Sequence, residues 1–201
     1  MKIRKLVIGQ LGTNSYVLGD KKVALVDPAA NAKGILNFLE KENLTLEKIL
    51  VTHGHFDHVG ALKELRDLTN AVCYMHHSDI PMLGSMEKSL GFMTGEIPEK
   101  CEIDVVLQGD EEIFVEDEKL TVLHTPGHSP GSVSYLGDGF VLSGDLIFKG
   151  SIGRYDYGDF ATEMESIEKL IGKLSDDCII LPGHGDETTV EQEKRNNPYI
   201  R

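Results

Sequence analysis

The segment that most constrains this chain is Thr-His-Gly-His-Phe-Asp-His-Val-Gly at residues 52–60. An apolar run at 48–52 leads into it and predicts a buried strand, and apolar residues at helical spacing follow it as far as Leu68. The segment is therefore predicted to be a strand-to-helix loop, where a rigid scaffold can present ligands. Its side chains include three imidazoles and one carboxylate, namely His53, His55, Asp57 and His58.

The spacing of these side chains predicts two neighbouring metal sites. In an extended segment His53 and His55 point the same way, because side chains repeat every two residues. Asp57 and His58 are adjacent and are predicted to serve a second point. Neither pair is complete, since metals held by imidazole and carboxylate take four or more ligands. The remaining ligands must come from later in the chain.

Three later segments can supply the missing ligands, because each ends a predicted strand on a polar residue flanked by glycine. They carry His128, Asp145 and His184. His128 is predicted to complete the site begun by His53 and His55, and His184 to complete the other site. Asp145 is predicted to bridge two metals about 3.5–4 Å apart, with one carboxylate oxygen on each, and a water or hydroxide would fill the remaining gap.

Length and composition predict one globular domain, residues 1–201, and exclude several classes of function. A net charge of −13 and a pI near 5.0 argue against nucleic acid as a partner. No apolar run approaches a membrane span, and Met1–Gln10 lacks the apolar stretch of a signal peptide. The three cysteines have no CxxC spacing and are predicted to be reduced thiols of a cytoplasmic protein. The sequence sets no oligomeric state.

The order of predicted elements indicates two packed β-sheets with helices outside. Short β-type runs come first and end with 23–26, and a helix is predicted at 32–41. A second group of strands lies between 105 and 142. A helix predicted at 162–174, with Thr162 as its N-cap, follows this second group.

Two stretches between these groups have less defined patterns. The polar residues at 76–79, His-His-Ser-Asp, follow a predicted strand and are interpreted as a polar strand end and not as ligands. Residues 81–100 are rich in methionine and glycine and have weak periodicity. They are either a mobile lid or substrate wall, since methionine adapts to varied shapes, or an irregular covering of the core.

The HxHxDH run at residues 53–58, followed in order by His128, Asp145 and His184, resembles the metallo-β-lactamase superfamily. The similarity extends from Asp27 to His184. The resemblance implies an α/β fold, the αββα four-layer sandwich, with the metals at one edge of the two sheets. It also implies that Asp27, at a strand end before proline, is a carboxylate that orients the metal-binding histidines.

Within that superfamily, Gly153-Arg154-Tyr155-Asp156 resembles the Gly-Arg-x-Asp signature of compact glyoxalase II-like hydrolases (hydroxyacylglutathione hydrolase-like) and of their persulfide dioxygenase relatives. The resemblance implies that Arg154 places an anionic substrate or orders the loop near the metals. The alternative is a surface ion pair with Asp156, which contributes little. Longer glyoxalase II enzymes carry an extra glutathione-binding domain. Only seventeen residues follow His184, so that domain is expected to be absent and the glutathione part of the substrate stays open.

The leading functional hypothesis is hydrolysis of a small thioester by two divalent metals, with zinc preferred and iron or manganese as alternatives. The metals would polarise the carbonyl and lower the pKa of the attacking water or hydroxide to ~7. Asp57 is the predicted catalytic residue, because it could orient this nucleophile while bound to one metal. A thiolate leaves readily, so no strong general acid is needed. The predicted partner is a small acyl-thiol.

Other functions use the same residues. His53, His128 and Asp145 alone would form a two-histidine, one-carboxylate triad suited to mono-iron oxygen chemistry, as in persulfide dioxygenases. Hydrolysis of a lactone or another ester could use both metals. A metal-binding protein without turnover is a third alternative. Nothing outside the metal ligands supports a β-lactamase role.

Overall fold

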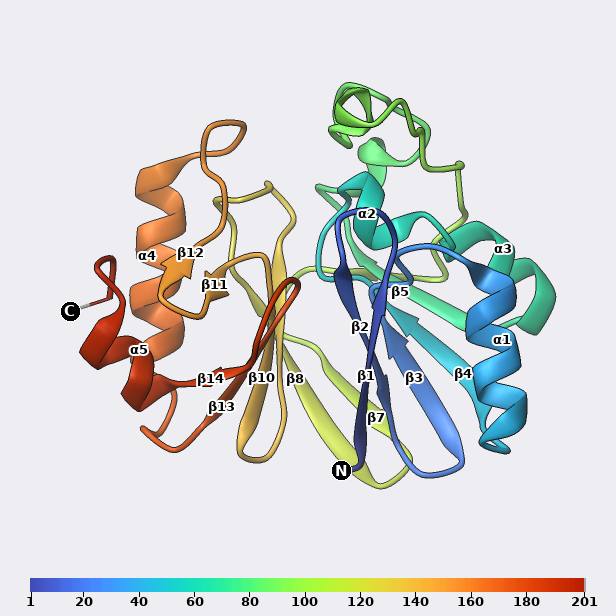
Figure 1. The fold of residues 1–201 in the computed structure, drawn as a ribbon, viewed down its shortest axis with the longest axis horizontal. Coiled ribbons are helices and arrows are strands. Elements are labelled where there is room, and N and C mark those ends of the chain that lie inside the picture. Colours follow the sequence, from blue (N-terminus) through green and yellow to red (C-terminus); the bar gives the residue numbers. More distant parts are fainter. Residues whose placement is uncertain (201) are drawn as a thin grey trace.

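A computed structural model, which describes residues 1–200, contains two six-stranded sheets packed face to face (Figure 1). The first sheet has the strand order β1-β2-β3-β4-β5-β6, with bounds Ile3–Ile8, Thr13–Leu18, Lys22–Val26, Thr45–Leu50, Val72–His76 and Val105–Leu107. The second has the order β14-β13-β10-β9-β8-β7, with bounds Thr188–Thr189, Ile179–Pro182, Phe140–Gly144, Val133–Leu136, Glu118–His124 and Glu112–Val115. A small two-stranded sheet, β11 (Ile147–Phe148) and β12 (Ser151–Ile152), lies beside the second.

Helices α1 (Ala32–Lys41), α2 (Phe56–Val59) and α3 (Leu62–Thr69) connect the parallel strands β3, β4 and β5. The sequence predicted one helix from the histidine-rich loop to Leu68, and the structure divides it between α2 and α3. Gly60 lies at the division, where a Cβ atom would come within 2.4 Å of the Ala29 carbonyl oxygen. The Ala61 amide donates to the Pro28 carbonyl at 2.9 Å, so the chain turns there to stay against the end of β3.

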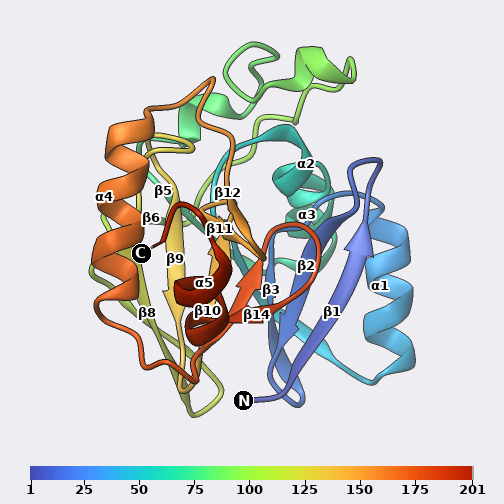
Figure 2. The same ribbon diagram turned by 60° about the vertical axis from the view of Figure 1, so that its left-hand side comes forward.

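Helices α4 (Phe160–Ile171) and α5 (Val190–Asn196) cover the second sheet. The prediction that Thr162 is the N-cap of α4 is wrong. Asp159 is the cap, and its side chain accepts a hydrogen bond from the Thr162 amide at 2.8 Å. An aspartate at the cap position satisfies an amide that has no partner in the first helical turn, so α4 begins before Thr162. Figure 2 shows α4 and α1 on opposite sides of the molecule.

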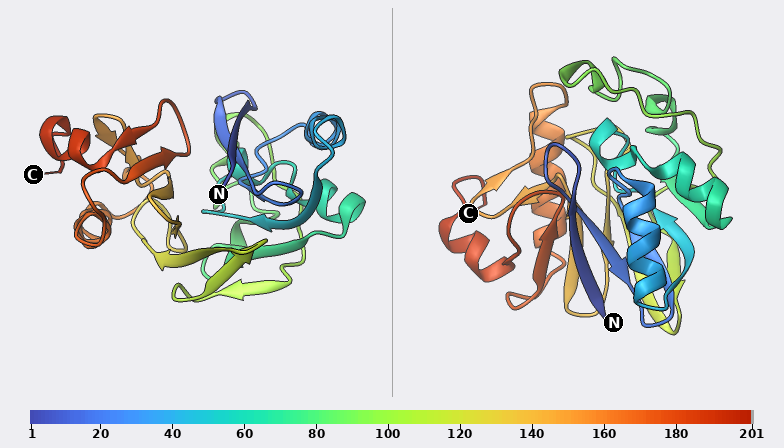
Figure 3. Two further views of the ribbon diagram at one scale, coloured as in Figure 1. Left: turned by 90° about the horizontal axis from the view of Figure 1, so that it is seen from below. Right: turned by 45° about the vertical axis from the view of Figure 1, so that its right-hand side comes forward.

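Three apolar clusters hold these layers together, and they confirm two packed sheets with helices outside. The middle cluster lies between the sheets and includes Leu18, Leu50, Val122 and Tyr135. A second joins the first sheet to α1 and α3, and a third joins the second sheet to α4 and α5. Figure 3 shows this order from below, with helices outside both sheets. The chain therefore has the αββα fold, and the apolar residues on both faces of each sheet account for it.

The long connection from β5 to β6 contains two short 3₁₀ helices, η1 (Ile80–Met82) and η2 (Gly91–Met93). It lies above α2 in Figure 1, coloured green. The Gly84 amide donates to the Pro98 carbonyl at 2.8 Å and closes the base of this segment. No helix within residues 1–200 is long and apolar enough to span a membrane.

Candidate metal centre

The polar loops singled out in the sequence meet at one edge of the two sheets. Strands β8 and β10 are both antiparallel to β9 and so share a direction, and β13 is parallel to β10. Their carboxyl ends lie at one edge, where His128, Asp145 and His184 follow them. The Asn14 amide of β2 donates to the Gly183 carbonyl at 2.7 Å and ties the His184 loop to the first sheet, which carries His53 after β4.

All seven side chains predicted as ligands converge there in three overlapping groups. In each group one ligand atom from every residue lies within 4.8 Å of the others. The groups are His53, His55 and His128; Asp57, His58 and His184; and His53, His58 and Asp145. The first two are the two sites that the spacing predicted, and the third joins them.

Asp145 lies between the two groups. Its Oδ2 atom is 3.7 Å from His128 Nε2 and 3.5 Å from His184 Nε2, and its Oδ1 atom is 3.4 Å from His58 Nε2. One oxygen, Oδ2, therefore approaches histidines of both groups. The expectation that each carboxylate oxygen binds one metal stays a prediction.

Several atoms in this cluster are buried without a hydrogen-bond partner among the described residues. They are Nε2 of His53, His58 and His128, and Oδ1 of Asp145. Buried polar atoms almost always have a partner, so atoms left without one require an explanation. All four face the centre of the cluster, and imidazole and carboxylate are the ligands that zinc, iron and manganese accept. The donor set therefore fits two divalent cations.

The Nδ1 atoms of the same three histidines are held by their surroundings. His53 Nδ1 lies 3.0 Å from Thr52 Oγ1, His58 Nδ1 lies 2.9 Å from Asp27 Oδ2, and His128 Nδ1 lies 2.9 Å from the Arg154 carbonyl oxygen. With Nδ1 as the donor, each ring presents an unprotonated Nε2 to the centre. This arrangement fixes the ring orientation of metal-binding histidines in proteins.

Asp27 lies where the resemblance implied, beside the histidines and almost completely buried. Its Oδ1 accepts from the Thr52 amide at 2.7 Å, and its Oδ2 accepts from Thr52 Oγ1 at 2.7 Å and from His58 Nδ1 at 2.9 Å. Its backbone has a φ of 52°, which is uncommon for a residue other than glycine. These bonds fix Asp27 against both His58 and the residue that precedes His53.

Asp79 is a site residue that the sequence interpretation missed. It is 0% exposed, and its Oδ2 accepts from the Gly54 amide at 2.9 Å and from Ser129 Oγ at 2.6 Å. Its Oδ1 accepts from the Gly131 amide at 2.7 Å. Asp79 thus joins the loop of His53 and His55 to the loop of His128. The one sequence signal was an acidic residue after a strand, which also fits an ordinary turn.

Two histidines of the first group, His53 and His55, are held in the neutral form. Burial lowers the pKa of His53 well below its usual value and lowers the pKa of His55 to about 3, with neighbouring imidazoles adding to the effect. Both rings are therefore neutral at neutral pH, which is the state that binds metal.

The second group contains ionised carboxylates. Burial raises the pKa of Asp57, but His58 and His184 outweigh it and bring the pKa to about 2. Asp145 is held well below its usual pKa in the same way. In return these carboxylates overcome burial and raise the pKa of His184 to about 9. Metal binding would therefore release protons from this group, because a cation replaces the proton between imidazole and carboxylate.

A cavity of about 380 Å³ opens beside His55 and His128. Its walls come from the β5–β6 connection and from the loop before α4. Its lining includes the side chains of Met82, Lys88, Phe92 and Tyr157. Phe92 and Tyr157 have ring centroids 5.9 Å apart and face each other across the two segments. The β5–β6 connection therefore lines this cavity, and parts of it also belong to the core cluster of the first sheet, so its role as a substrate wall stays a prediction.

Arg154 forms the surface ion pair that was one of its two interpretations. Its Nε and Nη2 donate to the Asp156 carboxylate at 3.0 and 2.5 Å, and its guanidinium carbon lies 5.4 Å from the Tyr157 ring centroid. Both charged side chains are more than half exposed. The Arg154 carbonyl oxygen is the acceptor for His128 Nδ1, so the backbone of this loop orients a candidate ligand.

Comparison with known families matches residues 8–184 to the metallo-beta-lactamase superfamily, and the chain belongs to that superfamily. It is 36% identical to the probable metallo-hydrolase YqgX of Bacillus subtilis, over 100% of this chain and 98% of that protein. It is 34% identical to the hydroxyacylglutathione hydrolase GloC of Haemophilus influenzae, over 90% of this chain and 88% of that protein.

Solved structures have the same fold. The BLEG-1 B3 metallo-beta-lactamase superposes with a TM-score of 0.94 at 35% identity and covers 99% of both chains. TTHA1623 in a di-iron-bound form superposes with a TM-score of 0.88 at 32% identity, covering 98% of this chain and 100% of that one. The resemblance drawn from the sequence is confirmed. The chain belongs to a superfamily of metallo-hydrolases and carries a histidine and aspartate cluster that can hold divalent metals.

Proposed function

We propose that the chain is a binuclear metal-dependent hydrolase that cleaves a small thioester. The proposal rests on two adjoining groups of candidate ligands, which Asp145 joins. Buried Nε2 atoms in both groups have no hydrogen-bond partner within residues 1–200. The relationship to a hydroxyacylglutathione hydrolase supports a thioester as the substrate class. Zinc is the proposed metal, and the di-iron form of TTHA1623 supports iron as the alternative.

The proposed ligands of the first metal are His53, His55 and His128. Those of the second are Asp57, His58 and His184, and Asp145 is shared. Bound there, the cations would polarise the thioester carbonyl and lower the pKa of the attacking water.

Asp57 is proposed to orient that water. Its Oδ2 accepts from Thr13 Oγ1 at 2.9 Å, which fixes the rotation of the carboxylate. Its low pKa keeps it an acceptor at neutral pH. The thiolate product is a good leaving group, so the site requires no separate proton donor.

The cavity next to His55 and His128 is proposed to hold the substrate. Phe92 and Tyr157 present apolar rings to it, 48% and 53% exposed, and Lys88 supplies a cation for a carboxylate of an acyl-thiol. Arg154 is proposed to act mainly through its backbone, because its guanidinium is already paired with Asp156. The buried cysteines, unpaired within residues 1–200, support a cytoplasmic location.

The test is hydrolysis of S-lactoylglutathione by the wild type, by Asp145→Ala and by Asp186→Ala. Asp186 is a matched control, because it is an exposed aspartate close to His184 in sequence and its one ion pair within residues 1–200 is with Lys149. Asp145→Ala is expected to lose metal and to lower turnover by more than about a hundredfold. About a hundredfold is the upper range for residues that only orient ligands, and the loss of a ligand should exceed it. Its circular dichroism should stay that of the wild type, and Asp186→Ala should keep full activity.

Other outcomes would overturn parts of the proposal. Full metal content and activity in Asp145→Ala would overturn the assignment of the shared ligand. A wild type that opens lactones or β-lactams but leaves thioesters intact would overturn the substrate class; the similarity to BLEG-1 makes the β-lactam assay necessary. Oxygen uptake with a persulfide and one iron per chain would replace hydrolysis with the mono-iron dioxygenase reaction.

A further inference from the structure

Two segments that are far apart in the sequence line the cavity beside His55 and His128. One is the β5–β6 connection, and the other is the loop before α4. The Phe92 and Tyr157 rings, one from each segment, stand at an interplanar angle of 70°. The apolar side chains of the lining are Met82, Leu90, Phe92, Pro130 and Tyr157. The cavity next to the first group of candidate ligands therefore offers mainly apolar contacts, as small-molecule sites in proteins commonly do.

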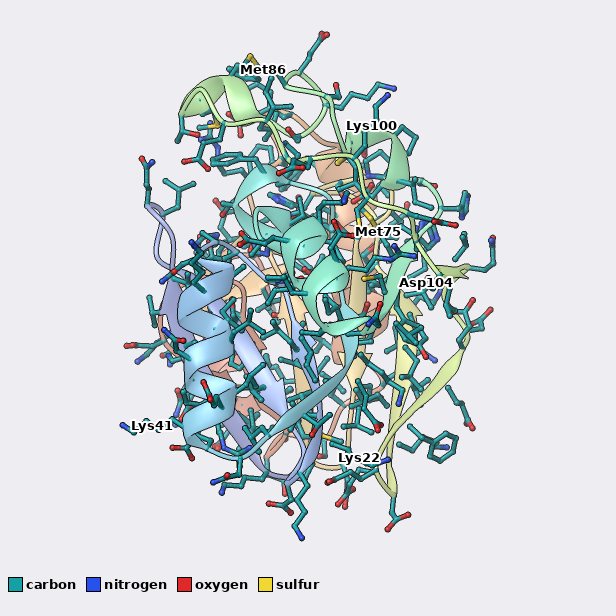
Figure 4. All side chains as sticks on the ribbon, turned by 90° about the vertical axis from the view of Figure 1, so that its right-hand side faces the viewer. Lys22, Lys41, Met75, Met86, Lys100 and Asp104 are labelled. Atoms are coloured by element: carbon teal, nitrogen blue, oxygen red, sulfur yellow. The ribbon has the colours of Figure 1, made fainter. Side chains whose placement is uncertain are left out.

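The same two segments carry further apolar side chains that are exposed to solvent. Figure 4 shows Met86 at the outer end of the β5–β6 connection, away from the sheets. The further exposed side chains are Met86, Met93 and Ile97 on the β5–β6 connection, and Tyr155 and Phe160 on the other segment. Exposed apolar side chains that gather on one part of a surface mark sites of interaction, including ligand-binding grooves. This part of the surface is therefore suited to a ligand that carries an apolar group.

The polar side chains of the lining offer little to recognise a hydroxyl group. Ser129 Oγ donates to Asp79 Oδ2 at 2.6 Å and lies 2.7 Å from Ser132 Oγ, so its hydrogen is already used. Apart from the two histidines, the other polar side chains of the lining are the exposed Glu87 and Lys88. A site that selects for a substrate hydroxyl holds it with buried polar partners. The hydroxyl of a hydroxyacyl thioester would therefore gain no dedicated contact in this cavity.

We propose that this cavity binds an apolar acyl group, aromatic or branched aliphatic, and that the chain prefers thioesters with such a group to hydroxyacyl thioesters. The inference rests on the proposed thioester hydrolysis and names the substrate class within it. The reaction stays the same: water attacks the carbonyl carbon, the C–S bond breaks, and a carboxylic acid and a thiol are released. S-lactoylglutathione is then a slower substrate at the same site.

The acyl group is assigned to the cavity because it is the part of the substrate that can be apolar throughout. A polar carrier such as glutathione would place charged groups against the Phe92 and Tyr157 rings, and burying a charge without a partner is costly. Lys88 is exposed and can still pair with a carboxylate of the carrier.

The size of the preference follows from these contacts. One methylene group in a hydrophobic pocket changes kcat/KM by about 10–200-fold. A phenyl ring has more apolar surface than a methylene group, and contact with the Phe92 and Tyr157 rings adds an aromatic interaction. The preference for a phenylacetyl over a lactoyl group should therefore be at least about tenfold.

The first experiment compares kcat/KM for S-phenylacetylglutathione and S-lactoylglutathione, each divided by the rate at which hydroxide alone cleaves that thioester. We expect the wild type to favour the phenylacetyl substrate by about tenfold or more. Phe92→Ala and Tyr157→Ala should each lower this preference several-fold. Phe114→Ala is the matched control, because Phe114 is a similarly exposed aromatic residue on the edge strand β7, outside the cavity lining, and it should leave the preference unchanged.

The second experiment measures binding without chemistry. S-(2-phenylethyl)glutathione and S-(2-hydroxypropyl)glutathione have the shapes of the two substrates but no carbonyl group, so they cannot be hydrolysed. Isothermal titration calorimetry should show the phenylethyl compound binding about tenfold more tightly to the wild type, and Phe92→Ala should remove most of that difference.

The two experiments separate the failure of this inference from the failure of the proposed function. If neither thioester is cleaved while the phenylethyl compound still binds more tightly, the proposed hydrolysis is wrong and the apolar cavity stands. The inference is overturned if the lactoyl substrate and the hydroxypropyl compound are favoured or equal, or if Phe92→Ala and Tyr157→Ala behave like Phe114→Ala. Since the wild-type preference alone decides the first of these outcomes, a variant that fails to fold does not affect the test.

Discussion

Glu163 is expected to destabilise this protein as the pH rises. It lies in the first turns of α4, is 0% exposed, and neither carboxylate oxygen has a hydrogen-bond partner within residues 1–200. It packs against two loops of the metal centre, since a Cβ at Gly127 would lie 2.3 Å from its Cα and one at Gly153 would lie 2.9 Å from its Oε1. Burial, with a smaller contribution from Asp145, raises the pKa of Glu163 from 4.5 to about 7.

The substitution Glu163→Gln removes this effect and should stabilise the protein increasingly at high pH. The folded state binds the Glu163 proton more tightly than the unfolded state, so wild-type stability is complete below the unfolded pKa and falls as pH rises through the folded pKa. Each pKa unit corresponds to about 1.4 kcal/mol, so the full loss is about 3 kcal/mol. About 2 kcal/mol of it develops between about pH 5.5 and about pH 8.5. Glutamine does not ionise and should lack this loss.

The assay is urea unfolding of metal-free wild type and Glu163→Gln at several pH values. Metal-free protein is used because bound cations would offset the contribution of Asp145. Glu168→Gln, at an exposed position on the same helix, is the matched control and should not reproduce the stabilisation that Glu163→Gln gives at high pH. A pH-dependent cost of burying Glu163 is refuted if the difference in the free energy of unfolding between Glu163→Gln and wild type stays constant or decreases as pH rises.

Three further variants test the site and its supports. Asp27→Asn should weaken metal binding by about 10–100-fold while the fold is kept, because His58 and Thr52 lose their carboxylate acceptor. A competition titration with a chelating dye measures the metal affinity, and an unchanged affinity would contradict the role of Asp27 in orienting the histidine. Asp79→Ala should lower the free energy of unfolding by about 3 kcal/mol, because three buried donors lose their acceptor. If urea unfolding gives the variant a free energy of unfolding within about 0.5 kcal/mol of the wild-type value, this prediction is wrong. Phe92→Ala should raise KM for the thioester several-fold with little change in kcat, and a fall in kcat alone would place Phe92 outside the binding wall.

The cluster of candidate metal ligands was predictable because its signal is local. The run from His53 to His58 is contiguous, and its period-two spacing sorts the first two histidines from the pair that follows. His128, Asp145 and His184 each follow a strand, and strands that share a direction bring their carboxyl ends to one edge. The two-sheet arrangement followed from two runs of strands, each followed by helices.

The residues that escaped prediction depend on tertiary contacts. Asp79 accepts from Gly54 and Gly131, which lie far from it in sequence, and no local pattern indicates which loops will meet there. Glu163 lies near the start of the helix predicted at 162–174 and is buried, whereas its apolar neighbour Met164 is only half-buried. A charged residue contradicts the hydrophobic pattern, so the pattern cannot predict its burial.

The most direct test of the account is the metal content of protein purified without added metal, with hydrolysis of S-lactoylglutathione assayed on the same sample. The two adjoining ligand groups predict about two divalent metals per chain together with thioester hydrolysis. About one iron per chain with no hydrolysis would contradict the binuclear thioesterase.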